Sequence, residues 1–309
     1  MKEIYQKTLA NSVSFEGIGL HSGKTSKIKI LPGSENQGIV FKRIDLQNNN
    51  IVLANYKNVS SAKLCTTLEN KDGVKVSTVE HLLAALYITE IDNAVIEIDN
   101  EEVPIMDGSA KDFINILQKI KTRTLAKKRK YLKIIDKVEL IDGERKISIE
   151  PIEEDSLLVN FQLNYENKII GKQKNIINFQ ADDLQQIIES RTFCLYEDIE
   201  KIKKAGLAKG GSLENALVVD KEKVINEKGL RNEKEFVNHK IIDLAGDFLL
   251  SGYRVLGKVT CYQGGHELTN MFLRKLLNLN AVSENVKFQD ILISKKRNLS
   301  QPLKLVANA

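Results

Sequence analysis

The chain has 309 residues, 42% hydrophobic and 28% charged, which is enough to bury sizeable cores and suggests two domains. Its net charge of +5 argues against a dedicated nucleic-acid-binding protein but permits a local site for an anionic ligand. The three cysteines are far apart and form no CxxC motif, which argues against disulfides and a thiolate zinc site. Since no signal peptide and no long apolar run is present, we expect a cytoplasmic protein with no transmembrane segment.

The first part of the chain reads as strands and helices in turn. Helical periodicity predicts helices at 78–87, with Ser77 or Thr78 as N-cap, and at 109–120 after a turn at Asp107-Gly108. β-forming residues predict strands at 38–43 and 94–98. The basic stretch that follows, KTRTLAKKRKYLK, is interpreted as a linker with a solvated charged surface rather than a nucleic-acid-binding arm. We therefore expect two domains, 1–126 and 127–309.

The second part shows the same mixture of elements. Strands are predicted at 131–141, 145–150, 157–165, 216–219 and 254–262, and helices at 181–190, 196–205, 233–250 and 267–277. The final residues are expected to be loosely ordered. Each half places a Val-x-His triplet, ending at His81 and at His239, in a helix that is followed by a strand. This pattern predicts an α+β fold of two similar domains, each sending a helix to a shared seam.

One predicted helix carries two candidate metal ligands, His239 and Asp243, in the sequence FVNHKIIDLAGD. The i, i+4 spacing places both side chains on one helix face, and imidazole and carboxylate are both good zinc ligands. The rest of this helix is apolar, and burying an acid is costly unless it is paired or bound to metal. The alternative is a His–Asp pair on the helix surface.

A second predicted helix contains the adjacent pair Glu80 and His81 in STVEHLLAAL. Neighbouring helix residues point about 100° apart, so Glu80 can lie beside a metal-bound water as general base while His81 binds the metal. Two histidines and one aspartate leave a fourth zinc position open, which is typical of a catalytic site. The alternative is a glutamate favoured by the helix dipole above a packed histidine.

A further histidine, His266, follows Gly264-Gly265 and is predicted to lie on a loop. A histidine that titrates near neutrality suits a general acid that protonates a leaving amine. Asp247, one turn beyond Asp243, is placed to orient it. The alternative is a polar residue that caps a helix.

Seven stretches taken together resemble the UDP-3-O-acyl-N-acetylglucosamine deacetylases, the zinc amidases of lipid A synthesis. They follow the family's order, and the resemblance covers essentially the whole chain. The stretches are GIGLHSG (17–23), STVEHLLAAL (77–86), VPIMDGSA (103–110), SRTFCLYEDIE (190–200), KGGSLENALVV (209–219), NEKGLRNEKEFVNHKIIDLAGD (226–247) and GGHELTN (264–270).

The resemblance implies two α+β domains packed with their helices between two sheets, each with a small insert. The insert of the second domain, about 194–221, would form part of an acyl-chain passage. The implied zinc ligands are His81, His239 and Asp243, the same residues that their spacing suggests. Glu80 would be the general base and His266 the general acid, with Asp247 behind it.

The resemblance also implies further site residues. Thr192 and Lys240 would hold the oxyanion and the substrate. The implied substrate contacts are Phe193 at the sugar, Phe161 at the uridine, Ile199 and Leu213 along the acyl passage, and His21, Asp107 and Cys65 near the site. Ala208 and Lys209 stand where some family members are expected to carry bulkier apolar residues, which bears on the preferred acyl-chain length.

The expected reaction is zinc-dependent hydrolysis of UDP-3-O-[(3R)-3-hydroxyacyl]-N-acetylglucosamine to acetate and UDP-3-O-acyl-glucosamine, the committed step of lipid A biosynthesis. We expect a monomer that binds no nucleic acid and touches the membrane, if at all, through its acylated substrate. Three alternatives stay open. They are a zinc amidohydrolase for another N-acyl group, a non-catalytic nucleotide- or RNA-binding protein, and a structural zinc site. The basic stretch lacks interleaved aromatic residues, which counts against RNA binding, and the open zinc position counts against a structural site.

Overall fold

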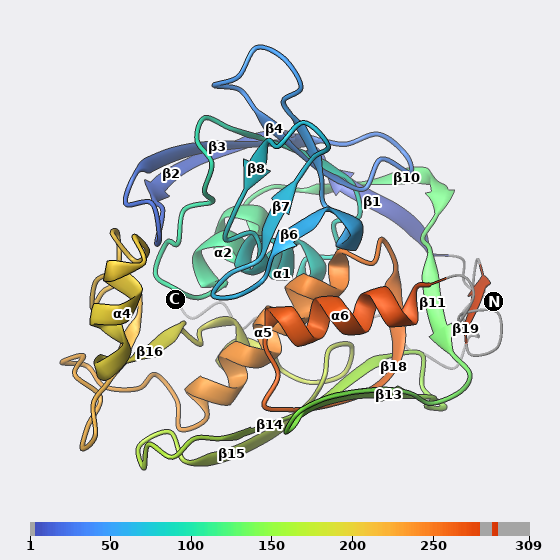
Figure 1. Cartoon of the computed structure of the whole chain (residues 1–309). Helices are drawn as coiled ribbons and strands as arrows, with labels where there is room; N and C mark the ends of the chain where they lie inside the picture. The colour runs from blue at the N-terminus through green and yellow to red at the C-terminus, as the bar shows by residue number, and fades with distance from the viewer. Residues whose placement is uncertain (1–3, 279–285, 290–309) are drawn as a thin grey trace.

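The structure is a computed structural model that describes residues 4–278 and 286–289. Four helices lie in the middle of the molecule, between two layers of β-sheet (Figure 1). They are α1 (Glu80–Ile88), α2 (Lys111–Gln118), α5 (Glu235–Leu249) and α6 (His266–Leu276). This arrangement confirms the predicted α+β fold. No helix in the described ranges is long and apolar enough to cross a membrane.

The upper sheet has the strand order β2-β3-β9-β4-β5. Its strands are β2 (Val13–Ile18), β3 (Thr25–Pro32), β9 (Ala94–Ile98), β4 (Ile39–Arg43) and β5 (Ile51–Leu53). Buried and exposed residues alternate along most of β3, because one face of the sheet packs on the helices and the other faces solvent. Beside it, a small insert sheet contains β6 (Val59–Ser61), β7 (Thr67–Glu69) and β8 (Lys75–Val76) after the short helix η1 (Tyr56–Asn58).

The lower sheet has seven strands among the described residues and is centred on β18. It contains β11 (Tyr131–Ile134), β12 (Val138–Asp142), β13 (Arg145–Glu150), β14 (Leu157–Asn164), β15 (Lys172–Asn178), β18 (Arg254–Tyr262) and β19 (Val286–Gln289). Strand β18 pairs in parallel with β11 and β14 and antiparallel with β13. The second insert pairs β16 (Phe193–Leu195) in parallel with β17 (Leu217–Val219) and carries η2 (Tyr196–Asp198) and α4 (Ile199–Lys204).

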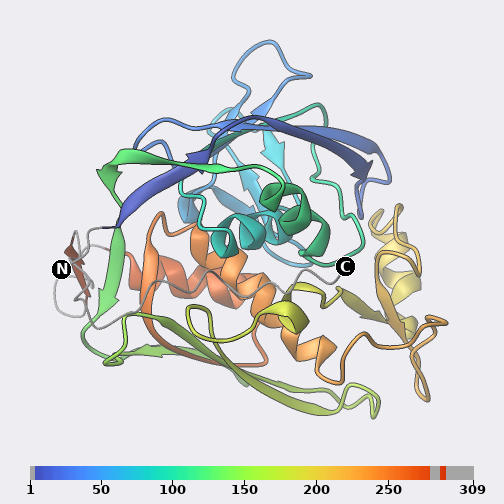
Figure 2. The same cartoon turned by 180° about the vertical axis from the view of Figure 1, so that it is seen from behind.

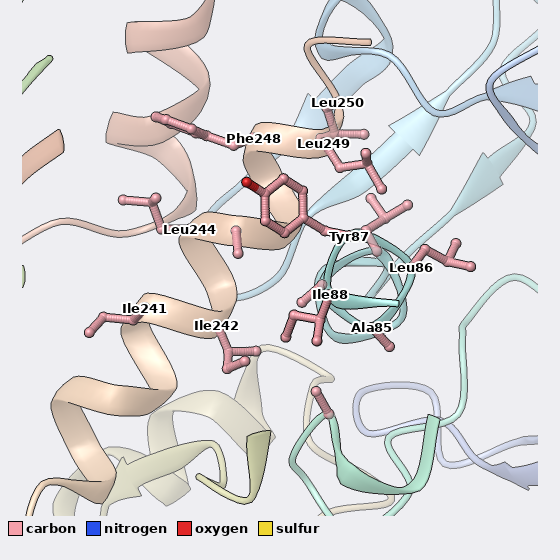
Figure 3. Packing of buried hydrophobic residues seen from close by; sticks show 14 of the residues in the cluster. Ala85, Leu86, Tyr87, Ile88, Ile241, Ile242, Leu244, Phe248, Leu249 and Leu250 are labelled. Atoms are coloured by element: carbon pink, nitrogen blue, oxygen red, sulfur yellow. The ribbon is translucent and has the colours of Figure 1, made fainter. Parts of the chain in front are cut away.

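The two central helices, α1 and α5, meet in the middle of the core. Every residue of α1 is buried, and so is nearly all of α5. Ile88 on α1 and Ile242 on α5 point into the space between them (Figure 3). The closest approach is at Gly246, where an added Cβ atom would lie 2.1 Å from the Glu80 carbonyl oxygen. Glycine at this position therefore lets the two helices that carry the candidate ligands approach each other.

The opposite end of the seam is joined by ion pairs. Asp92 accepts hydrogen bonds from Arg129 at 3.0 Å and from Arg254 at 3.2 Å. Arg254 also donates to the carbonyl oxygens of Tyr87 and Ile91 around the end of α1. A cavity of about 1050 Å³ lies beside this cluster, away from the candidate metal ligands. The buried arginines of this cluster are already paired with Asp92, so we interpret the cluster as a structural contact that holds the two layers together.

Several sequence predictions need correction. The stretch interpreted as a linker contains β10 (Thr122–Lys128), which pairs antiparallel with β1 (Tyr5–Leu9). From β10 the chain passes from the upper layer to the lower one (Figure 2). The helix expected at 181–190 is a single turn, α3 (Gln185–Ile188), because residues just before it form turns around Asn178. The expected loose end of the chain lies largely outside the described residues.

Candidate metal centre and active site

The three predicted ligands come together in the buried centre of the molecule. His81, on the first turn of α1, and His239 and Asp243, one turn apart on α5, form a group that can hold a metal ion. The Nε2 atoms of His81 and His239 lie 3.4 Å and 3.3 Å from Asp243 Oδ1. This oxygen is buried and has no hydrogen-bond partner among the described residues. A cation between these atoms would satisfy it, so the donor set fits a metal.

The protonation states of this group also suit metal binding. His239 Nδ1 lies 3.2 Å from the carbonyl oxygen of Ser190, which can only accept, so Nδ1–H donates and Nε2 keeps its lone pair. Burial lowers the pKa of His239 to about 3, although Asp243 opposes the shift. Burial by itself would raise the pKa of Asp243, but His239, Lys240 and His266 hold it well below its usual value. The site therefore presents a neutral imidazole and a carboxylate.

Glu80 and His266 face the same space from two different helices. His266 Nε2 lies 3.7 Å from Glu80 Oε1 and 3.8 Å from Asp243 Oδ2. On the other side of the ring, His266 Nδ1–H donates to Asp247 Oδ2 at 2.8 Å. The structure thus places a carboxylate and an imidazole directly beside the three candidate ligands, with Asp247 orienting the imidazole. His266 is the first residue of α6 rather than a loop residue.

Opposing effects set the pKa values of this pair. Burial raises the pKa of Glu80, against the lowering effect of His266 and His81. Burial would lower the pKa of His266, but the carboxylates of Asp247, Glu80 and Asp243 raise it to about 10. The raised pKa favours the protonated, donating form of His266. A carboxylate and an imidazolium facing one space are the two groups that general base and general acid catalysis require.

Lys240 and Phe193 border the cluster on the side of the second insert. Lys240 Nζ donates to Asp243 Oδ2 at 2.9 Å and lies 5.6 Å from the centroid of the Phe193 ring. The Phe193 ring also packs edge-on against His239 with centroids 6.3 Å apart. The backbone of Thr192 is held by two hydrogen bonds. Its N–H donates to the Gly108 carbonyl oxygen at 2.8 Å, and its carbonyl oxygen accepts from the Leu217 N–H at 2.8 Å. A cation and an aromatic face therefore lie next to the metal group.

A buried ion pair positions the start of α5. Arg191 Nε donates to Glu235 Oε1 at 2.7 Å, and its backbone N–H donates to the same oxygen at 3.1 Å. Glu235 is fully buried and also accepts from the backbone N–H of Arg231 at 2.6 Å. Sequence reasoning did not find this pair. It fixes the segment that carries Thr192 relative to the helix that carries His239.

Most of the chain matches a known protein family. Residues 6–278 match the family model described as LpxC, UDP-3-O-acyl N-acetylglycosamine deacetylase. The chain belongs to this family. Relatives named UDP-3-O-acyl-N-acetylglucosamine deacetylase include a protein of Pseudoalteromonas translucida, 40% identical over 93% of this chain and 95% of its own length. Another, from Shewanella violacea, is 38% identical over 93% of this chain and 94% of its own length.

Within this deacetylase, two more predicted site residues are Cys65 of the first insert and His21 of the loop after β2. Cys65 lies near Glu80, and burial together with the Glu80 charge raises the pKa of its thiol to about 12. His21 is buried, and its Nδ1 is 3.4 Å from the Ala208 N–H of the second insert. Burial lowers the pKa of His21, although Glu102 opposes the shift. The loop around His21 therefore contacts the second insert.

The remaining predicted substrate contacts differ from one another in burial and in hydrogen bonding. The Asp107 carboxylate accepts hydrogen bonds from Arg231 at 2.8 Å and from the Ser109 hydroxyl at 2.7 Å, so both of its oxygens are bonded within the protein. Leu213 is exposed and Ile199 half-buried on the second insert. Phe161 is 2% exposed and its ring lies beside Gly264, and its contact with the uridine stays a prediction.

Sequence reasoning also missed Thr66. Its Oγ1–H donates to Asp247 Oδ1 at 2.7 Å and its N–H donates to Glu80 Oε2 at 3.1 Å. No sequence spacing indicates this contact, because Asp247 lies 181 positions further along the chain.

Proposed function

We propose that this deacetylase hydrolyses UDP-3-O-[(3R)-3-hydroxyacyl]-N-acetylglucosamine to UDP-3-O-acyl-glucosamine and acetate, with zinc, as the committed step of lipid A biosynthesis. The observation that carries the proposal is the buried His81, His239 and Asp243 group with Glu80 and His266 beside it. The names of the relatives, which match this chain along nearly its whole length, support this substrate.

The zinc would be held by His81, His239 and Asp243, three ligands that leave one position free. When bound, zinc supplies Lewis-acid activation of the carbonyl group and lowers the pKa of water. The Ser190 carbonyl keeps the His239 ring in the tautomer that a metal needs. Nitrogen and oxygen ligands also suit other divalent metals, so the identity of the metal is tested by removing it and adding zinc back.

The chain's own residues divide the proton transfers between them. Glu80 takes a proton from the attacking water as the oxygen forms a bond to the acetamide carbon. Lys240, with Thr192, stabilises the negative charge that develops on the carbonyl oxygen. His266 Nε2 gives its proton to the nitrogen, the C–N bond breaks, and acetate and the free amine are released. Asp247 keeps the His266 ring aligned throughout and stabilises its positive charge until the proton is transferred.

The second insert would receive the rest of the substrate. Phe193, which packs against Lys240 and His239, would contact the sugar. Ile199 and Leu213 on the same insert would line the path of the acyl chain, and an exposed leucine there suits an apolar ligand. His21 and Cys65 would border the sugar from the other side. We further propose a cytoplasmic monomer with domains 1–126 and 127–309.

The proposal is tested by measuring acetate release from three compounds. These are UDP-3-O-(3-hydroxyacyl)-N-acetylglucosamine, UDP-N-acetylglucosamine and free N-acetylglucosamine. We expect efficient release only from the acylated UDP-sugar. Equal release from free N-acetylglucosamine would instead favour a zinc amidohydrolase with another N-acyl substrate, and no release from any of them would contradict the proposal.

A further inference from the structure

Thr66 is a buried residue at the entry to β7 whose polar atoms are all committed to the two central helices. Its side chain and backbone are 1% exposed. Its carbonyl oxygen accepts from the N–H of Val79, the residue that precedes α1, at 3.4 Å. Its N–H donates to Glu80 Oε2 at 3.1 Å, and its Oγ1–H donates to Asp247 Oδ1 at 2.7 Å. One small residue of the first insert thus contacts both α1 and α5.

These bonds close a ring around the acid–base pair. Asp247 accepts from Thr66 on Oδ1 and from His266 on Oδ2. Glu80 accepts from Thr66 on Oε2 and faces His266 Nε2 with Oε1, at 3.7 Å. Since each carboxylate has one oxygen fixed by Thr66, the other oxygen of each has a defined direction. The direction of Asp247 Oδ2 in turn sets the plane of the imidazole ring.

The hydroxyl of Thr66 holds Asp247 through a strong hydrogen bond. A short O–H···O⁻ bond to an ionised acceptor in a buried site is stronger than a neutral hydrogen bond. Without it, Asp247 Oδ1 would lose its hydrogen-bond donor, and only Oδ2 would stay bonded, to His266. Asp247 would then be free to rotate toward other donors, and His266 would follow it.

We propose that Thr66 is a positioning residue for deacetylation, because it aligns Asp247 and Glu80 so that His266 and Glu80 face one reaction space. The inference rests on the proposed function, in which these two groups transfer the protons. Thr66 itself is screened from the substrate by the residues it holds. Its loss should therefore lower kcat and leave KM unchanged.

The neighbour Thr67 provides a matched control. It is also a threonine of the first insert, but its Oγ1 lies near Cys65 Sγ, at 3.8 Å, rather than near a carboxylate. Substituting valine at either position keeps the shape and the backbone bonds while removing the hydroxyl. Only the change at Thr66 should affect the alignment of His266.

The experiment measures kcat, KM, bound metal and Tm for the metal-loaded wild-type enzyme and for Thr66→Val, Thr66→Ser and Thr67→Val. We expect Thr66→Val to lower kcat by about 10- to 100-fold with unchanged KM and metal content. Thr66→Ser, which keeps the hydroxyl, should regain most of kcat, and Thr67→Val should behave as wild type. If Thr66→Val does not retain metal, Thr66→Ala replaces it in the same comparison.

A double-mutant cycle separates alignment from general stability. In an Asp247→Ala background, Thr66→Val should cost no further kcat, because Thr66 acts through Asp247. Wild-type kcat in Thr66→Val, or equal losses in the valine and serine variants, would overturn the inference. An inactive wild-type enzyme would point instead to failure of the proposed function, so the two failures are distinguishable.

Discussion

Replacing Gly246 with alanine should separate the two helices that build the site. The added Cβ atom would lie 2.1 Å from the Glu80 carbonyl oxygen, 2.9 Å from its carbonyl carbon and 3.1 Å from the Ala84 nitrogen. All three atoms are backbone, so a side-chain rotation cannot relieve the contact, and α1 must move away from α5. The movement displaces His81 relative to Asp243.

The size of the effect follows from two opposing terms. Overpacking a core costs about 1–3 kcal/mol, and the upper value applies because the contact is with backbone. Alanine regains about 1 kcal/mol of helix propensity over glycine. The net loss of about 2 kcal/mol should lower Tm by about 4–8 °C. A misplacement of about 1 Å among reacting groups costs about 100-fold in rate, so activity should fall further than stability.

The assay compares Tm, bound metal and acetate release in Gly246→Ala and Gly265→Ala. The second variant is the control, since a Cβ at Gly265 meets no atom within 4 Å and its backbone is extended. We expect the control to retain its Tm. A Gly246→Ala protein with wild-type Tm and wild-type activity would refute the idea that this helix contact sets the site geometry.

Three further predictions concern charged groups. Arg191→Ala leaves Glu235 buried without its partner, so thermal or urea unfolding should show a loss of about 3–5 kcal/mol; an unchanged unfolding free energy would count against a structural role for the pair. Glu80→Gln should lose acetate release while elemental analysis still finds bound metal, and full activity would remove the general-base role. In the metal-free protein, the pKa of His266 is raised from 6.5 to about 10. Its stabilising contribution should therefore be complete below about pH 6.5 and lost as pH rises through about 10. Unfolding free energies over that range should depend less on pH in His266→Gln, and identical curves would contradict this assignment.

Local sequence patterns predicted individual helices and strands. The helix expected at 78–87 is α1, Glu80–Ile88, and the strand expected at 94–98 is β9. Helical spacing also predicted that His239 and Asp243 share a face, because i, i+4 residues are always neighbours on a helix. Their approach to His81 depends on a helix crossing at Gly246, which no local pattern indicates.

The features that were not predicted also have physical causes. The burial of Phe161 could have been predicted, because it stands at one of the alternating buried positions of β14. Strand alternation alone would have placed its ring in the core. The basic stretch before Tyr131 appeared to be a linker because its residues are polar, but polar residues suit β10, a strand that is exposed along most of its length. Thr66 could not be found, since its partner Asp247 is distant in sequence.

Acetate release before and after metal removal tests the central claim most directly. The purified protein would be assayed with UDP-3-O-(3-hydroxyacyl)-N-acetylglucosamine, treated with a chelator, assayed again, and then titrated with zinc. We predict that release stops on chelation and returns with about one zinc ion per chain, whereas His239→Ala neither binds that zinc nor recovers. Undiminished acetate release from the metal-free protein would contradict the assignment of His81, His239 and Asp243 as a catalytic metal centre.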